Sequence, residues 1–135
     1  MLRYCVDLDN TLAKYKRGDA DLDINKIGDP IPGAKEFVDN LARHIGNDNK
    51  SARIIIFTRR VAETQKGPER ETLKKSIAKW LNKHGFYWNE IYDDDGKPDG
   101  TVFIDDRGVQ CRPEENPNAY KEAEEYIKNV ILTYR

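Results

Sequence analysis

The sequence predicts an α/β fold built around a mainly parallel β-sheet, and three observations support this class. Apolar runs rich in β-branched residues occupy positions 2–7, 53–57 and 101–104, as is typical of buried strands. Segments with apolar residues at helical spacing lie between these runs and after them. Strands that alternate with helices usually form a parallel sheet with right-handed crossovers.

The first strand is predicted at 2–7, at the very start of the chain. Residues 12–31 are polar and contain glycines and a proline, so we expect a long loop there, and loops of this length are often functional. Apolar residues at helical spacing then predict a helix from about 32 to 46.

The uninterrupted run at 53–57 predicts a strand that is buried on both faces, and the polar residues 59–67 predict a loop after it. Pro68 is a favourable first-turn residue and Gly85 a favourable C-terminal cap, so we expect a helix between them. The apolar residues of this helix share one stripe: Leu73, Ile77, Trp80 and Leu81.

Beyond that helix the pattern is weaker. Residues 86–92 predict a short strand, and the turn-rich loop 93–100 leads into the strand at 101–104. A final helix is predicted from about 118 to 133, with one apolar side facing the core. That side consists of Ala119, Ala123, Tyr126, Ile127, Val130 and Ile131.

Length and composition limit the classes of protein to consider. The 135 residues fit a single domain, 1–135. The net charge of −1 gives no basic field of the kind that attracts nucleic acid. We find no secretory signal and no apolar run of the roughly 20 residues that a membrane helix needs. Cys5 and Cys111 fit neither a disulfide framework nor a metal cluster, so we expect free thiols in a reducing cytoplasm.

Two carboxylates spaced one residue apart, Asp7 and Asp9, end the first strand. Because side chains on a strand alternate between its faces, both start on the same side. Acidic side chains at the carboxyl end of a first strand indicate a ligand site in an open α/β sheet. One could be a nucleophile and the other its proton partner, with a divalent metal offsetting their repulsion. A solvated acidic turn is the alternative that this pair alone leaves open.

Reactive side chains also follow the other two clear strands. Thr58 follows the second strand, Asp105 and Asp106 follow the third, and Lys97 stands eight residues before Asp105. The carboxyl ends of parallel strands meet at one edge of a sheet, so these side chains could converge. Cleavage of a phosphate monoester through an aspartate nucleophile requires this mixture: an attacking carboxylate, a proton donor, positive charge, and a hard metal such as Mg²⁺.

In these features the chain resembles the haloacid dehalogenase superfamily of phosphohydrolases. The four motifs of that superfamily occur in order, as Asp-Leu-Asp-Asn-Thr at 7–11, Ile-Ile-Ile-Phe-Thr at 54–58, Lys-Pro at 97–98 and Val-Phe-Ile-Asp-Asp at 102–106. The resemblance implies a Rossmann-like, three-layer sandwich. Each long gap between motifs holds one loop and one helix, which is similar to capless members, including small phosphatases of polysaccharide biosynthesis and of phages.

The resemblance also implies a role for each motif residue. Asp7 would form the aspartyl-phosphate, and Asp9 would act first as general acid and then as general base. Thr58 and Lys97 would hold the phosphoryl group. The implied Mg²⁺ ligands are Asp7, the backbone carbonyl of Asp9, Asp105 and Asp106.

Four more residues are candidates for binding the phosphoryl group: Leu8 and Asn10 within the first motif, and Arg59 and Arg60 directly after the second. Arg60 is the stronger of the two arginines, because members of the superfamily often have an arginine two places after the second-motif threonine. A solvated surface charge is the alternative interpretation of both arginines.

We therefore expect a Mg²⁺-dependent phosphomonoester hydrolase that acts on a small or medium substrate, such as a sugar phosphate or a nucleotide. A phosphotransferase and a non-catalytic phosphate- or metal-binding module are the alternatives. A receiver-type signalling domain uses similar residues, but its acceptor aspartate normally follows a later strand. Capless relatives usually oligomerise or act on large substrates, so a homo-oligomer is a further option.

Overall fold

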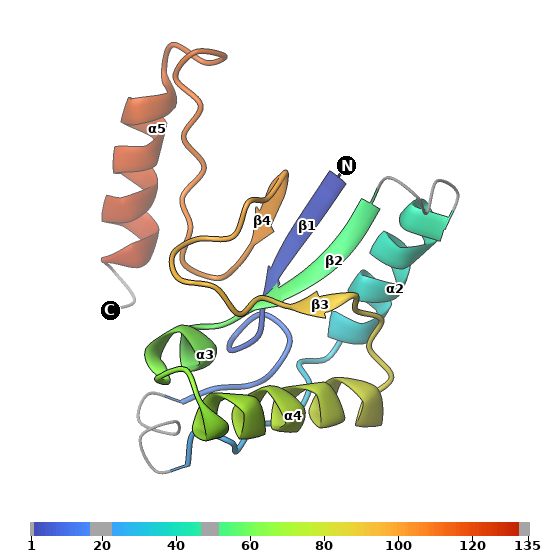
Figure 1. Cartoon of the computed structure of the whole chain (residues 1–135). Helices are drawn as coiled ribbons and strands as arrows, with labels where there is room; N and C mark the ends of the chain where they lie inside the picture. The colour runs from blue at the N-terminus through green and yellow to red at the C-terminus, as the bar shows by residue number, and fades with distance from the viewer. Residues whose placement is uncertain (1, 17–22, 47–51, 133–135) are drawn as a thin grey trace.

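In the described part of the chain the sheet has four strands, all parallel, in the order β3-β2-β1-β4 (Figure 1). The computed structural model describes residues 2–16, 23–46 and 52–132. The strands are β1 (Leu2–Asp7), β2 (Ala52–Phe57), β3 (Glu90–Ile91) and β4 (Val102–Ile104). The prediction of an α/β fold with a parallel sheet is therefore confirmed.

β1 lies between β2 and β4. After β1 the chain adds β2 and then β3 on one side of it, and β4 pairs with its other side. Cys5 is aligned with Ile55 on one neighbour and with Phe103 on the other, and Asp7 is aligned with Phe57. Aligned residues of parallel neighbours face the same side of the sheet. Asp7 therefore shares one face of the sheet with two aromatic rings.

The main core lies against the opposite face of the sheet. Val6, Ile54 and Ile56 have no exposed surface there, and they pack with residues of α2 (Ala34–Gly46) and α4 (Pro68–Lys83). Figure 1 shows α2 beside β2 and α4 running below the strands. The predicted stripe on α4 is confirmed, since all four of its members are buried: Leu73, Ile77, Trp80 and Leu81.

The ends of α4 are fixed by the two residues that the sequence singled out. Pro68 occupies the first turn, where its missing N–H costs no hydrogen bond. Gly85, at φ 74°, donates to the Asn82 carbonyl, and Phe86 donates to the Leu81 carbonyl. These two bonds form a Schellman motif, which needs the left-handed conformation that glycine adopts without strain.

The described parts of the long loop, 12–16 and 23–31, are held against each other and against α4. Lys14 N–H donates to the Asp29 carbonyl at 2.8 Å. The two arms meet so closely at Gly28 that a Cβ there would lie 2.0 Å from the Lys14 oxygen. The indole N–H of Trp80 donates to the Gly28 carbonyl at 2.9 Å, which ties this loop to α4.

The prediction of a loop over 59–67 is partly wrong, because α3 (Arg59–Glu63) forms within it. The Thr58 side chain caps the first turn by accepting a hydrogen bond from Arg60 N. Arg59 pairs with Glu63 one turn later, and Val61 is buried in the core. Five residues are too few to show helical periodicity in a sequence, so the cap and the ion pair were the available signals.

The final helix forms, but its predicted orientation is wrong. α5 (Ala119–Tyr126) continues into a π-helical turn, η1 (Ile127–Ile131), and Figure 1 shows it standing apart beside β4. Of the predicted inward side, Ala119 is buried and Ala123 half-buried. Three of its large side chains are exposed instead: Tyr126, Ile127 and Val130. Helical spacing identifies an apolar face, but it does not identify a surface that the face packs against. The side chain of Ile131 and residue 133 lie outside the described part of the chain.

Both cysteines are free thiols, Cys5 buried in the sheet and Cys111 exposed in the loop before α5. None of the helices within 2–16, 23–46 and 52–132 combines the length and the apolar character needed to cross a bilayer.

Candidate active site

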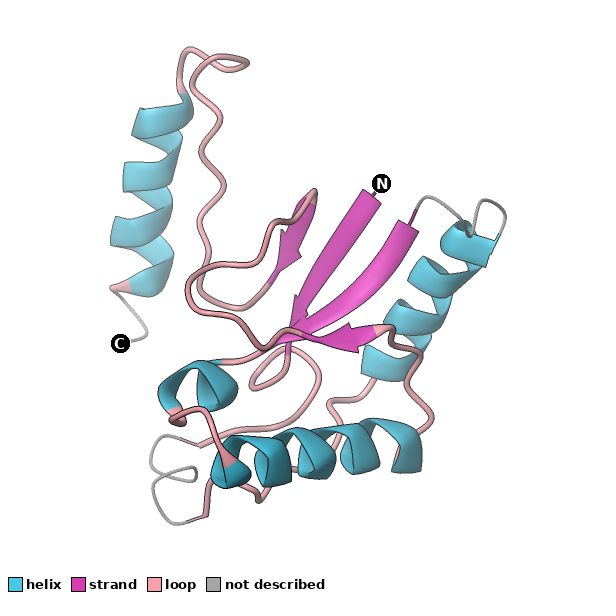
Figure 2. Cartoon of the chain, viewed as in Figure 1, coloured by secondary structure: helices cyan, strands magenta, loops and turns pink. Residues whose placement is uncertain are grey.

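The candidate site is a pocket of about 390 Å³ at the carboxyl end of β1, where loops follow the converging strands (Figure 2). Since β1 has β2 on one side and β4 on the other, this is the switch point at which open α/β sheets bind ligands. The pocket is lined by Asp7, Asp9, Asn10, Phe57, Thr58, Arg59, Asp105, Asp106, Arg107 and Gly108. Three strand ends that are far apart in sequence thus meet as predicted.

Asp7 is the last residue of β1 and lines this pocket together with three other aspartates, Asp9, Asp105 and Asp106. Burial raises the pKa of its carboxyl from 3.8 to about 7, and the negative charges of Asp106 and Asp9 add to the effect. The N–H of Leu8 donates to Asp7 Oδ1 at 2.8 Å and opposes the shift. In the described part of the chain, the charged groups that act most on the pKa of Asp7 are the carboxylates of Asp106, Asp9 and Asp105.

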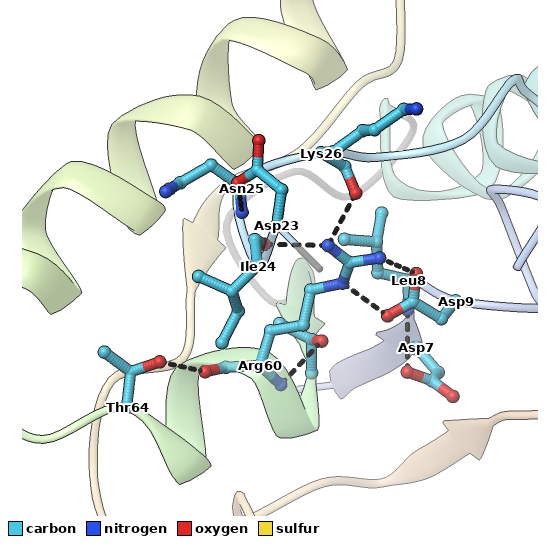
Figure 3. A network of polar contacts seen from close by, with 10 residues as sticks. Asp7, Leu8, Asp9, Asp23, Ile24, Asn25, Lys26, Arg60 and Thr64 are labelled. Carbon is cyan, nitrogen blue, oxygen red and sulfur yellow. Dashed lines mark hydrogen bonds and ion pairs between the residues drawn. The ribbon is translucent and has the colours of Figure 1, made fainter. Parts of the chain in front are cut away.

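Asp9 does not point freely into the pocket, because Arg60 holds its carboxylate with both arms of the guanidinium group (Figure 3). Arg60 Nε lies 2.8 Å from Asp9 Oδ2, and Nη2 lies 3.0 Å from Oδ1. Such a fork-to-fork pair fixes both the position and the rotation of the carboxylate. The Asp9 side chain keeps only 19% of its surface exposed.

Arg60 is itself buried, with 3% of its surface exposed. Its Nη1 donates to the carbonyls of Ile24 and Lys26, each at 2.7 Å, so the same side chain also anchors the segment 23–27 (Figure 3). Arg60 does not line the pocket, and its predicted contact with substrate stays a prediction. Sequence reasoning missed this pairing, since nothing in a single sequence connects residues 51 positions apart.

Thr58 is buried between the pocket and α3. Its hydroxyl oxygen accepts the 3.2 Å hydrogen bond from Arg60 N that caps α3. A hydroxyl group has one proton to donate as well as two acceptor positions, so the O–H can still donate to a ligand oxygen. Capping and ligand binding are therefore compatible roles for this side chain.

Asp105 and Asp106 follow β4 and line the pocket on the β4 side of β1, whereas Thr58 lines it on the β2 side. Asp105 Oδ1 accepts hydrogen bonds from the N–H groups of Arg107 and Gly108, which folds the chain into a tight turn. A Cβ at Gly108 would lie 3.0 Å from Asp105 Oδ1, so glycine permits this close approach. Asp105 Oδ2 is the oxygen that remains for a ligand.

Of the six residues to which the resemblance assigns a role, Lys97 alone does not line this pocket. Its ammonium group lies 4.0 Å from the ring centroid of Phe103, in cation–π contact. Lys97 lines a neighbouring pocket instead, which shares Phe57, Thr58 and Arg59 with the first. Its predicted contact with the phosphoryl group stays a prediction.

The remaining candidates differ in what they offer a ligand. The Leu8 side chain is fully buried in the core and does not line the pocket, so its predicted contact with the phosphoryl group stays a prediction. Asn10 lines the pocket at φ 61°, a left-handed conformation that asparagine tolerates better than most residues. Arg59 lines the pocket and is paired with Glu63.

The carboxylates of the pocket supply hard oxygen donors of the kind that Mg²⁺ prefers. Asp7, Asp105 and Asp106 line one pocket, and their mutual repulsion contributes to the raised pKa of Asp7. Among the described residues, however, no group of three or more His, Cys, Asp or Glu side chains is already arranged to hold a metal ion. The donor chemistry fits Mg²⁺, while binding would require these side chains to draw together.

Comparisons with protein-family models, with curated proteins and with solved structures found no match to this chain. The function is therefore inferred from the motifs and from the geometry of the pocket. Three lining residues were not among the predicted site residues: Phe57, Arg107 and Gly108. Their positions next to Thr58 and Asp106 in the sequence were the only available signal.

Proposed function

We propose that the protein is a Mg²⁺-dependent phosphomonoester hydrolase, a capless member of the haloacid dehalogenase superfamily with its three-layer, Rossmann-like core. The observation that carries this proposal is the pocket at the end of β1, where Asp7, Thr58 and Asp105 meet. The four motifs in their order support the same assignment. A cytoplasmic location is part of the proposal and agrees with two free thiols.

In the first step, Asp7 attacks phosphorus in line. The bond from phosphorus to the ester oxygen breaks as the bond to the carboxylate oxygen forms, and Asp9 donates its proton to the departing alcohol. Thr58, which is buried and lines the pocket, would donate its O–H to a phosphoryl oxygen. Asp7 is then an aspartyl-phosphate and Asp9 a carboxylate.

In the second step, Asp9 removes a proton from a water molecule, which attacks phosphorus. The acyl-phosphate bond breaks, inorganic phosphate leaves, and both carboxyl groups return to their starting states. Asp9 can perform either transfer only after it exchanges an Arg60 contact for one to substrate, because the guanidinium group holds both of its oxygens. Before the first transfer it also takes up a proton from solvent, because the ion-paired group is a carboxylate, and the second transfer restores that proton.

Mg²⁺ would be held by Asp7, Asp105, Asp106 and the backbone carbonyl of Asp9, and it would offset the negative charge that collects there. The raised pKa of Asp7 supports this ligand set. Burial raises it most, and the negative charges of the neighbouring carboxylates Asp106, Asp9 and Asp105 raise it further.

The test is phosphate release from a panel of phosphomonoesters, with Mg²⁺ and with EDTA. We expect release that EDTA abolishes and that falls at least a thousandfold in Asp7→Asn. Circular dichroism of the variant should show an intact fold. Release that persists in EDTA excludes the metal role, and release that persists in the variant excludes Asp7 as nucleophile.

A non-catalytic phosphate- or metal-binding module is the second candidate, and the Asp9–Arg60 pair favours it, since this pair restrains the proposed acid. Binding of Mg²⁺ or inorganic phosphate by calorimetry, without release from any ester, would support this candidate. Transfer of phosphate to an alcohol other than water would instead identify a phosphotransferase.

A further inference from the structure

A second pocket of about 300 Å³ opens directly beside the candidate active site. The two pockets share Phe57, Thr58 and Arg59, so a molecule bound in one can extend into the other. A phosphoryl group between Asp7 and Thr58 would direct the rest of its ester away from Asp7. The second pocket, on the far side of Thr58, is where the structure provides room for that ester group.

The walls of the second pocket are mostly apolar and include two aromatic residues. Phe57 and Tyr92 line it together with Ala62 of α3 and the buried Pro98. Phe57 is held edge-on against Phe103, with ring centroids 6.2 Å apart. Flat apolar walls suit a flat ring, whereas a small sugar bearing only hydroxyl groups would leave them without a matching surface.

The pocket is also held in shape from outside. Arg70, which is buried on α4, donates to the carbonyl and to the carboxylate of Asp93, and Tyr92 lies directly before Asp93. The Tyr92 hydroxyl donates to the Asp95 carbonyl at 3.2 Å. The ring of Tyr92 is therefore fixed at both ends, which lowers the entropy lost when a ligand stacks on it.

Polar groups that line the second pocket favour a flat ring that carries hydrogen-bonding groups over a plain apolar ring. Asp94 and Gly96 offer a carboxylate and a backbone for hydrogen bonds with ring nitrogens or amino groups, while Lys97 supplies positive charge. A nucleobase carries such donors and acceptors on a flat ring, and a simple aryl group does not.

We propose that the second pocket binds the leaving group of the substrate and that this group carries a nucleobase, which makes a nucleoside monophosphate the substrate class. This inference rests on the proposed phosphatase function and narrows its substrates. The phosphate would lie by Asp7 and Thr58, and the base between Tyr92 and Phe57.

The test compares esters that share a leaving alcohol. Adenosine 5′-monophosphate and ribose 5-phosphate both release a ribose 5′-hydroxyl, so their ratio of kcat/KM reports the base alone. We expect this ratio to be at least five, because stacking of one base on an aromatic side chain has about that effect or more. Benzyl phosphate against ethyl phosphate is the corresponding pair for a plain aryl ring, and we expect a smaller ratio there.

Ala62→Leu fills the second pocket from the exposed surface of α3, where leucine is a favourable helix residue. We expect it to lower the adenosine-to-ribose ratio at least fivefold, through KM. Gln65→Leu adds the same side chain outside both pockets and should leave the ratio as it is.

Each outcome bears on one of the two proposals. Hydrolysis of both ribose esters with a ratio near one, or a ratio that Ala62→Leu does not change, overturns the nucleobase pocket and leaves the phosphatase in place. A high benzyl-to-ethyl ratio with a low adenosine-to-ribose ratio overturns the assignment to a nucleobase. If no ester is hydrolysed, the phosphatase proposal fails. Calorimetry on Asp7→Asn then tests the nucleobase pocket separately. Equal affinity for adenosine 5′-monophosphate and ribose 5-phosphate overturns the nucleobase assignment, and tighter binding of the nucleotide supports it.

Discussion

At the scale of single residues, the contact between Asp9 and Arg60 determines what the site can do at rest. A carboxylate whose two oxygens both accept from one guanidinium group cannot at the same moment protonate a leaving group. The resting contact therefore keeps Asp9 beside the reacting position, and substrate would have to draw it away. Because Arg60 also holds the Ile24 and Lys26 carbonyls, any movement of this side chain is shared with the segment 23–27.

Removing the guanidinium group of Arg60 should lower the stability of the fold much more than removing that of Arg59. We expect Arg60→Met to lower the free energy of unfolding by about 3 kcal/mol, because it leaves a buried carboxylate and two carbonyls without their donor. Arg59→Met should cost less than about 0.5 kcal/mol, because Arg59 forms only an exposed surface pair. Urea unfolding measures both, and equal losses would show that the Arg60 network does not stabilise the fold.

Because the pKa of Asp7 is raised, we expect the free energy of unfolding to depend on pH when divalent cations are absent. Its pKa is about 7 in the folded protein and near 3.8 when unfolded, so between these values the folded state keeps a proton that the unfolded state has released. Stability therefore falls as pH rises from about 4 to about 7.

Asp7→Asn cannot ionise and should escape this loss. We expect the variant to be more stable than the natural chain at pH 8 by on the order of 2 kcal/mol, with the difference shrinking toward pH 5. Thermal unfolding in EDTA at both pH values measures this effect. A difference that grows toward low pH would contradict the sign and with it the raised pKa.

At the scale of elements, the helix with clear signals at both ends was predicted almost to the residue. Pro68 and Gly85 mark α4, and its stripe is buried as expected. α3 was missed because its cap, Thr58, also ends a strand and its pattern is only five residues long. The inward face of α5 was wrong for a different reason: amphipathic spacing is a local property, whereas burial depends on which other element lies nearby.

The loop between β3 and β4 depends on a connection to α4. Arg70 donates to the Thr64 carbonyl at 2.7 Å and to Asp93, and its side chain is only 5% exposed. We expect Arg70→Met to lower the free energy of unfolding by about 2 kcal/mol, since it leaves these acceptors unpaired. The substitution should also raise KM, because Tyr92 and Lys97, which line the second pocket, lie on the same loop as Asp93. Urea unfolding and initial rates measure the two effects.

Lys74→Met is the matched control, because Lys74 also contacts Asp93 but is more exposed. It should cost less than about 1 kcal/mol. Its hydrogen bond lowers the pKa of Asp93, so this contribution is present above pH 4 and fades as the carboxyl is protonated at lower pH. A Lys74 variant as unstable as the Arg70 variant at pH 7 would contradict the leading role of Arg70.

At the scale of the whole molecule, the sequence predicted which strand ends meet but not how their side chains are partnered. The parallel sheet alone brings Asp7, Thr58 and Asp105 together, because strand ends of one direction share an edge. Lys97 precedes its strand by several residues, so the path of a loop decides its place, and it lies in the second pocket. The Asp9–Arg60 pair depends on side-chain rotation and burial, which a single sequence does not encode visibly.

Because α4 is packed into the core and η1 is largely exposed, the same substitution should have unequal effects in the two helices. Ile77→Ala on α4 should lower the free energy of unfolding by about 3 kcal/mol, because Ile77 is fully buried in the core. Ile127→Ala in η1 should change it by less than about 0.5 kcal/mol, since 41% of that residue is exposed. Chemical unfolding measures both variants, and a large loss at Ile127 would show that α5 and η1 pack against something in solution.

Trp80 gives the molecule an optical reporter of its own. Its indole stacks on Phe86 at a centroid distance of 5.3 Å, has 8% of its surface exposed, and donates to the Gly28 carbonyl. Detachment of the segment around Gly28 would admit water to the indole and shift its fluorescence toward longer wavelengths. Trp88, whose indole N–H donates to Asn82 Oδ1, is the second tryptophan of the chain and adds its own emission. Fluorescence with Trp88→Phe could therefore follow the opening of this segment without any added dye, separately from the loss of the whole fold.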